Sequence, residues 1–273
     1  MKAFALRPIG VFDSGVGGLS VLRALHAEMP WERFIYVGDS GHAPYGERDD
    51  GHVASRSHAI ADYLIGTHQI KALVVACNTA TAAAIKDLRR RYPNLTVVGI
   101  EPALKPAAAA SQTKRVGVMA TRGTLNSSKF QSLLASQQGQ ATFVLQPCDG
   151  LAAAIEAQDA GEIQALCAGY TRNMGQFGTD LGQMDALVLG CTHYPFIEAI
   201  LRAQIATPIP FFEGGAPVAR QTHRLLQAAH HLAPESPSDF TSTTYFSTGH
   251  ELDLQKAVWR WLHCKAAVNT LSV

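Results

Sequence analysis

Short apolar runs alternate with longer amphipathic stretches along most of the chain. Segments such as residues 19–28 and 55–65 carry apolar residues at the 3.6-residue spacing of a helix. Continuous apolar strands joined by helices are typical of a parallel sheet that is buried on both faces, so the pattern predicts an α/β fold. The expected strands are residues 9–12, 34–37, 72–76, 96–100, 116–119 and 186–190.

Two pairs of similar segments form an internal repeat, which indicates two copies of one α/β unit. The segments occur in the same order in both copies and at similar offsets. The ungapped alignment places Cys77 on Cys191, and this match favours duplication over a chance likeness of two apolar strands. The paired segments are residues 9–14 with 116–121 and residues 72–79 with 186–193.

The repeat predicts two pseudo-symmetric lobes, each a mainly parallel sheet covered by helices. The first lobe is expected at residues 1–100 and the second at residues 101–211. Residues 212–273 remain as a C-terminal segment, in which the pattern predicts a helix, a short strand at 243–246 and a final helix. Sites in parallel sheets lie in the loops beyond the carboxyl ends of the strands, so candidate residues are sought there.

Composition narrows the class of protein. The 273 residues are 47% hydrophobic and 16% charged with a formal net charge of +1, which fits a compact metabolic enzyme with a sizeable core. Nucleic-acid binding is not expected, because it requires clustered basic residues and the basic run at 89–91 closes a predicted helix. No apolar run reaches the roughly 18 residues that span a bilayer, so a membrane location is not expected either.

Cysteine usage indicates a reducing compartment. The five cysteines form no Cys-x-x-Cys pair and are odd in number, which argues against a disulfide framework. The first residues contain no apolar signal-peptide core, and the expected location is the cytoplasm. A thiol-bound metal is a weak alternative, since its ligands do not cluster at the usual spacings. Cys148, Cys167 and Cys264 have no partner in the repeat and are expected in the core or on the surface.

Cys77 and Cys191 are the main candidates for chemistry. Each follows an apolar strand and precedes small polar residues and a predicted helix, where N–H donors and the helix dipole favour a thiolate. A single cysteine there is more often structural. Two thiols at equivalent positions suit the inversion of a stereocentre, because one removes a proton from one face while the other delivers a proton to the opposite face.

Several polar residues lie near these thiols in the sequence. Asp13 opens a glycine-rich turn that is not a phosphate-binding fingerprint; it is expected to contact an ammonium group, to orient a thiol or simply to cap a helix. Asp39 is typical of a capping residue in an ordinary turn. His193 either fills a structural role or tunes Cys191, two residues away. Glu156 lies on an Ala-rich helix, where a solvated face is the ordinary expectation.

Four motifs occur along the chain: Asp13-Ser14-Gly15-Val16-Gly17-Gly18-Leu19, Pro44-Tyr45-Gly46, Ala76-Cys77-Asn78-Thr79-Ala80 and Gly190-Cys191-Thr192-His193-Tyr194-Pro195. In order and spacing, and over nearly the whole chain, they resemble the glutamate racemases of the aspartate/glutamate racemase superfamily. The resemblance implies racemisation of glutamate without any cofactor or metal by a two-base mechanism, supplying D-glutamate for bacterial peptidoglycan. It also implies a homodimer, an active site in the cleft between two α/β lobes, and a C-terminal segment that returns to the first lobe.

The same resemblance implies roles for individual residues. Cys77 would deprotonate D-glutamate with the help of Asp13, and Cys191 would deprotonate L-glutamate with the help of His193. Glu156 falls where the family has an acidic group near the second cysteine, although the surrounding sequence matches only loosely. The residues implied to bind the substrate are Asp13, Ser14, Tyr45, Gly46, Asn78, Thr79, Thr121, Thr192 and His193.

Other functions remain open at this point. An aspartate racemase or another member of the superfamily would carry similar motifs, and rates on both amino acids would separate these possibilities. A one-thiol decarboxylase is disfavoured because both cysteines are present. A non-catalytic amino-acid-binding protein of two lobes is an alternative from a different class. Such proteins are often exported, whereas no signal peptide is expected here.

Overall fold

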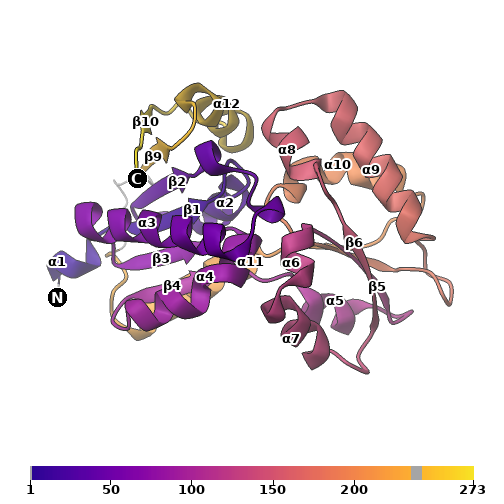
Figure 1. Cartoon of the computed structure of the whole chain (residues 1–273). Coiled ribbons are helices and arrows are strands. Elements are labelled where there is room, and N and C mark those ends of the chain that lie inside the picture. Colours follow the sequence, from indigo (N-terminus) through magenta and orange to yellow (C-terminus); the bar gives the residue numbers. More distant parts are fainter. Residues whose placement is uncertain (1, 235–241) are drawn as a thin grey trace. The chain divides into compact units, whose positions relative to one another are not determined.

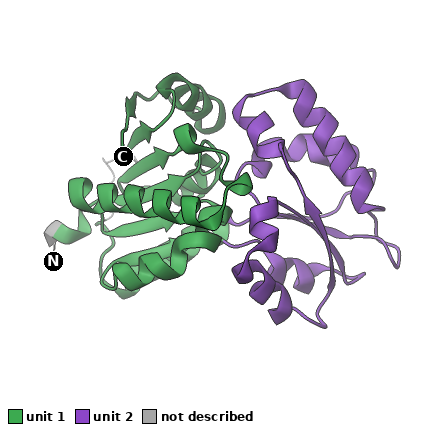
Figure 2. Cartoon of the chain, in the orientation of Figure 1, with its two compact units in different colours: residues 1–100, 215–273 green, residues 101–214 purple. Residues whose placement is uncertain are grey.

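The computed structural model describes residues 2–234 and 242–273, and the chain forms two compact units (Figure 2). Unit 1 comprises Met1–Ile100 together with Gly215–Val273, and unit 2 comprises Glu101–Gly214. Unit 2 is therefore one continuous stretch of chain, whereas unit 1 is made from two stretches that are far apart in sequence.

Unit 1 contains a six-stranded parallel sheet with the strand order β10-β9-β2-β1-β3-β4 (Figure 1). Every residue of β1, β2 and β3 is buried, as their continuous apolar sequences predict for strands covered on both faces. The strands are β1 (Ile9–Asp13), β2 (Phe34–Gly38), β3 (Ala72–Val75), β4 (Thr96–Gly99), β9 (Thr243–Ser247) and β10 (Val268–Thr270).

Helices cover both faces of this sheet. Helices α3 and α4 pack together and share one buried cluster with the strands, while α2 contacts α11 and α12 (Figure 1). Helix α4 ends in three arginines that suit its dipole, as the sequence predicts. The helices are α1 (Lys2–Ala5), α2 (Leu19–Glu28), α3 (Asp50–His68), α4 (Asn78–Arg91), α11 (Gly215–Ala228) and α12 (Glu251–Leu262), with 3₁₀ turns η1 (Ser40–His42) and η2 (Tyr45–Glu47).

Unit 2 contains a four-stranded parallel sheet with the order β6-β5-β7-β8. A separate buried cluster lies on each face of the sheet. The strands are β5 (Arg115–Ala120), β6 (Thr142–Pro147), β7 (Ala186–Leu189) and β8 (Phe211–Phe212). The helices are α5 (Leu104–Ala110), α6 (Arg122–Asn126), α7 (Ser128–Ser136), α8 (Leu151–Glu156), α9 (Ala160–Met174) and α10 (Glu198–Gln204), with the 3₁₀ turn η3 (Tyr194–Ile197).

Four strands of unit 1, in the order β2-β1-β3-β4, share their order and register with β6-β5-β7-β8 of unit 2, which confirms the predicted pair of pseudo-symmetric α/β lobes. Strand β1 lies between β2 and β3 as β5 lies between β6 and β7. Ile9 pairs with Ala72 just as Val116 pairs with Ala186. The two cysteines of the repeat therefore follow the same strand of the same arrangement. No helix within residues 2–234 and 242–273 is long and apolar enough to cross a membrane.

Candidate active site

Cys77 lies at the carboxyl edge of the unit 1 sheet, where β3 gives way to α4. It is the N-cap residue of this helix, and its Sγ accepts a hydrogen bond from the Ala80 N–H at 3.4 Å. Only 6% of the residue is exposed. The N–H donor and the positive end of the helix dipole both favour a negative charge on sulfur. Cys77 therefore occupies the position that the sequence predicts for a reactive thiol.

Asp13 is the last residue of the neighbouring strand β1 and Ser14 follows it, so both lie at the same carboxyl edge of the sheet as Cys77. Ser14 Oγ is 3.8 Å from Cys77 Sγ. The Asp13 carboxylate is fully buried, and its Oδ2 accepts a hydrogen bond from the Gly15 N–H at 3.0 Å. The alternative that Asp13 caps α2 is wrong, because the N-cap of that helix is Gly18 and no side chain caps it.

The glycine-rich turn allows a close approach to Asp13. A Cβ atom on Gly18 would lie 2.5 Å from the Asp13 Cβ and 2.9 Å from the Tyr36 hydroxyl. The Tyr36 hydroxyl donates a hydrogen bond to the Gly15 carbonyl at 2.6 Å, which fixes the turn from the adjacent strand. The glycines of this turn thus position a buried carboxylate, not a phosphate group.

Tyr45 and Gly46 lie on η2, which belongs to the loop that follows β2. Tyr45 is 1% exposed and shares a buried cluster with Cys77. Its hydroxyl donates a hydrogen bond to Asp39 Oδ2. Burial, followed by the charge of Asp39, raises the pKa of Tyr45 well above its ordinary value, so its hydroxyl stays protonated. Gly46 is half-buried beside it.

The prediction that Asp39 is an ordinary capping residue is wrong. Its side chain makes no cap hydrogen bond to η1. Instead, the carboxylate accepts hydrogen bonds from the Tyr45 hydroxyl, from Nε and one terminal nitrogen of Arg56, and from the Thr248 hydroxyl. Arg56 and Thr248 are distant in sequence, and no pattern in the chain links them to Asp39.

Asn78 and Thr79 form the first turn of α4 beside Cys77, and both are buried. The Asn78 Oδ1 atom has no hydrogen-bond partner within the described part of the chain. A buried acceptor left without a donor costs about 1–3 kcal/mol, so native structures rarely keep one unless a ligand or water supplies the donor. Asn78 is thus a candidate contact for a bound ligand that carries N–H groups.

Cys191 follows β7 in unit 2 at the position that corresponds to Cys77, and it is 7% exposed. The sequence predicts small polar residues and then a helix after this thiol, but the α-helix begins later here than α4 does after Cys77. The chain forms the 3₁₀ turn η3 instead, and α10 begins only at Glu198. Pro195 lies in the first turn of η3, where a proline is tolerated.

Cys191 does not lie at the N-terminus of an α-helix, and a series of polar side-chain contacts begins at its thiol instead. His193 Nδ1 lies 3.6 Å from Cys191 Sγ, and His193 Nε2 lies 2.6 Å from Glu156 Oε1. Burial alone would lower the pKa of His193, but its hydrogen bonds to Cys191 and Glu156 outweigh burial and raise that pKa well above 6.5. The imidazole can therefore remain protonated between Cys191 and Glu156.

The other predicted residues of unit 2 lie close to this chain of contacts in sequence or along the sheet edge. Thr121 follows β5 and caps α6, since its Oγ1 accepts a hydrogen bond from the Thr124 N–H. Thr192 is buried between Cys191 and His193. Outside the repeat, Cys148 and Cys167 are buried and Cys264 is exposed. The predicted site residues are thus gathered at two sheet edges, one in each unit.

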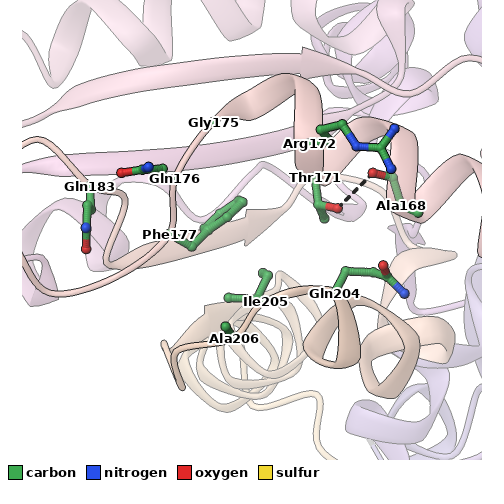
Figure 3. A pocket seen from close by; sticks show the side chains of 10 residues that line it. All are labelled: Ala168, Thr171, Arg172, Gly175, Gln176, Phe177, Gln183, Gln204, Ile205 and Ala206. Carbon is green, nitrogen blue, oxygen red and sulfur yellow. Dashed lines mark hydrogen bonds between the residues drawn. The ribbon is translucent and has the colours of Figure 1, made fainter.

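A cavity of about 450 Å³ lies elsewhere in unit 2 (Figure 3). Its walls come from the end of α9, from the residues before β7 and from the residues after α10, including Arg172, Phe177 and Ile205 (Figure 3). The residues before β7 lie at the amino edge of the sheet, whereas Cys191 follows the carboxyl end of β7. The cavity therefore lies toward the opposite edge of the sheet from Cys191. No cluster of three or more metal-ligating side chains occurs in residues 2–234 and 242–273.

Comparison with known proteins gives a consistent set of relatives. A family model described as Asp/Glu/Hydantoin racemase matches residues 9–222. A glutamate racemase of Ectopseudomonas mendocina is 46% identical over 254 residues, which cover 91% of each chain. A glutamate racemase from Bacillus anthracis superposes with a TM-score of 0.84 at 28% identity over 98% of both chains. The Escherichia coli glutamate racemase in complex with L-glutamate and the activator UDP-MurNAc-Ala superposes with a TM-score of 0.81 at 29% identity, covering 98% of this chain and 99% of that one.

Proposed function

Because the chain belongs to the Asp/Glu/hydantoin racemase family, we propose that it interconverts L- and D-glutamate with Cys77 and Cys191 as its two proton-transferring groups. One observation carries the proposal: both thiols follow the same strand of two units that share strand order and register. The named relatives are glutamate racemases, and this chain matches each of them over almost its full length. These matches support glutamate over aspartate as the substrate.

The proposed reaction is a proton transfer across the α-carbon. Starting from L-glutamate, the Cys191 thiolate takes the α-proton and becomes a thiol, leaving a carbanion stabilised by the α-carboxylate. The Cys77 thiol then donates its proton to the other face, which yields D-glutamate and a Cys77 thiolate. The reverse direction exchanges the two roles. The proposal requires that both sulfurs reach one α-carbon, and it requires no cofactor or metal.

The surroundings of each thiol supply different support in this proposal. In unit 2, protonated His193 stabilises the Cys191 thiolate and Glu156 holds the imidazolium. In unit 1, the helix N-terminus stabilises the Cys77 thiolate. Asp13 orients the neighbouring turn, and its carboxylate accepts hydrogen bonds from the Gly15 N–H and from an ammonium group. The two thiolates are therefore stabilised by different groups in this proposal.

The substrate contacts follow from the polar groups at the two sheet edges. Asn78 Oδ1 accepts a hydrogen bond from the substrate ammonium group, which supplies a donor that the described part of the chain does not. The remaining contacts are proposed for Ser14, Tyr45, Gly46, Thr79, Thr121, Thr192 and His193. The enzyme is further proposed to act as a cytoplasmic homodimer that supplies D-glutamate for peptidoglycan.

Isotope incorporation tests the two-thiol mechanism. After dialysis against a chelator, the protein is given either enantiomer in deuterated water, and newly inverted product should carry deuterium at the α-carbon. Cys77→Ala and Cys191→Ala should each abolish racemisation, whereas Cys264→Ala, which removes an exposed thiol, should not. Near-normal racemisation by either of the first two variants would refute the mechanism, and faster racemisation of aspartate than of glutamate would refute the substrate.

A further inference from the structure

The Asp39 carboxylate is a fully buried charge at the meeting point of separate parts of unit 1. Arg56 on α3 donates two hydrogen bonds to it, from Nε at 3.0 Å and from a terminal nitrogen at 2.9 Å. The Thr248 hydroxyl donates to Oδ1 at 2.7 Å, His42 Nδ1 lies 3.1 Å from the same oxygen, and the Tyr45 hydroxyl donates to Oδ2. One carboxylate thus joins the loop after β2, helix α3 and the turn after β9.

These contacts hold Asp39 in its ionised form. Burial alone would raise the pKa of the carboxyl group, but hydrogen bonds from Arg56, Tyr45 and Thr248 outweigh burial and lower that pKa. An ionised acceptor binds the Tyr45 proton strongly, so this hydroxyl is a committed donor toward Asp39. The Tyr45 oxygen then presents only lone pairs to any other neighbour.

The carboxylate is not a requirement of the repeated fold. The Asp39 N–H bonds to the Asp13 carbonyl at 3.0 Å, and in unit 2 the Cys148 N–H bonds to the Ala120 carbonyl at 2.9 Å. Cys148 therefore occupies the equivalent position at the carboxyl edge of the second sheet. It is a buried thiol whose Sγ contacts the Gln146 carbonyl. The same backbone position is thus filled without a charge in unit 2, so the charge in unit 1 needs another explanation.

The C-terminal stretch of unit 1 is fitted closely to the loop that carries Tyr45. The Thr248 N–H bonds to the Gly38 carbonyl at 3.1 Å, and the Gly41 N–H donates to the Thr248 hydroxyl at 3.2 Å. A Cβ atom on Gly41 would lie 2.5 Å from the Thr248 carbonyl oxygen. Thr248 therefore contacts both the backbone of the loop and the carboxylate that holds Tyr45.

We infer that Asp39 is a positioning residue for glutamate binding, which fixes the Tyr45 hydroxyl through a carboxylate held by Arg56 and by Thr248 from the C-terminal stretch. The inference rests on the proposed function, since it assigns Tyr45 to the substrate. Asp39 itself does not touch the reacting atoms in this account. It sets where the phenol lies and which of its hydrogen-bonding groups is available.

A double-mutant cycle tests this inference. Asp39→Asn and Tyr45→Phe should each raise KM for both enantiomers by about tenfold, the effect of one lost hydrogen bond to a charged group. If Asp39 acts through Tyr45, the double variant should be no worse than Tyr45→Phe alone. Asp62→Asn is the matched control, because it removes an exposed carboxylate of the same unit that pairs with Arg91. Calorimetric binding of D-glutamate should follow the same pattern as KM.

Thr248 provides a test that does not require loss of the buried charge. Thr248→Val should raise KM in the same direction by a smaller factor, and Thr248→Ser, which keeps the hydroxyl, should restore it. Additive effects of Asp39→Asn and Tyr45→Phe would overturn the inference, as would an unchanged KM in Thr248→Val. A wild-type protein without racemase activity on glutamate would refute the proposed function instead.

Discussion

Replacing Glu156 by Gln removes a charge from the polar contacts of Cys191 while keeping the shape of the side chain. Glu156 Oε1 lies 2.6 Å from His193 Nε2, and His193 Nδ1 lies 3.6 Å from the thiol. The negative carboxylate is one of the two groups that raise the pKa of His193. Glu156→Gln should therefore lower this pKa and reduce the fraction of the imidazolium that we propose to stabilise the Cys191 thiolate.

The size of the effect follows from the geometry. A hydrogen bond to a charged group contributes about 1.5–3 kcal/mol. The Glu156 side chain is 23% exposed, so solvent weakens its interaction and the lower value applies. A loss of about 1.5 kcal/mol corresponds to a rate about tenfold lower for the step that uses Cys191 as the base. The defect should grow as the pH rises, because His193 of the variant loses its proton at a lower pH than His193 of the wild type, and it should shrink at lower pH.

The assay must separate the two thiols. In racemisation, kcat/KM has to change equally in both directions, because the equilibrium between enantiomers is fixed. Loss of HCl from a β-chlorinated glutamate needs only one proton removal, so each enantiomer reports on one thiol. Glu156→Gln should slow elimination from the L-form about tenfold and leave the D-form within about twofold. Glu198→Gln, which removes an exposed carboxylate paired with Arg202, is the control. Equal slowing of both enantiomers would refute the reasoning.

Two further predictions concern stability. Because the folded pKa of His193 is raised above 6.5, its stabilising contribution is complete below that pH and is lost as pH rises through the folded pKa. His193→Asn should thus lower the free energy of unfolding in urea by more near pH 6 than near pH 9, and a pH-independent difference would contradict this. Gly18→Ala places a Cβ 2.5 Å from the Asp13 Cβ and should cost about 1–3 kcal/mol of stability and most of the activity. A Cβ atom added at Gly66 on α3 would meet nothing within 4 Å, so Gly66→Ala should slightly raise the melting temperature. Equal melting temperatures for Gly18→Ala and Gly66→Ala would be inconsistent with this packing.

Buried central strands were predictable from sequence because their apolar runs are continuous. Strand β3 was expected at residues 72–76 and is Ala72–Val75, and its counterpart β7 was found through the repeat. Strand β6 was not predicted. It is an edge strand whose residues are exposed or half-buried, so its sequence lacks a continuous buried run. Two-residue β8 is too short to leave a pattern.

The candidate site was likewise predictable from sequence only in part. The thiols were found because duplication places two cysteines at equivalent strand ends, and the activity expected from the motifs is confirmed by the relatives. The individual roles of the site residues stay predictions. Contacts between distant segments gave no signal in the sequence: Asp39 meets Arg56 across 17 positions and Thr248 across 209. Glu156 was singled out only through the resemblance, and its contact with His193 spans 37 positions.

The discontinuous course of unit 1 constrains how the chain can be made. Synthesis proceeds from the N-terminus, so β1 to β4 and the whole of unit 2 emerge before β9 exists. Until β9 arrives, β2 has no neighbour on one side and presents an open row of backbone donors and acceptors. Unit 2, in contrast, is continuous and can close its own sheet as soon as residue 214 has left the ribosome. The second unit can thus mature first, while the first unit waits for the last part of the chain to cover its exposed strand.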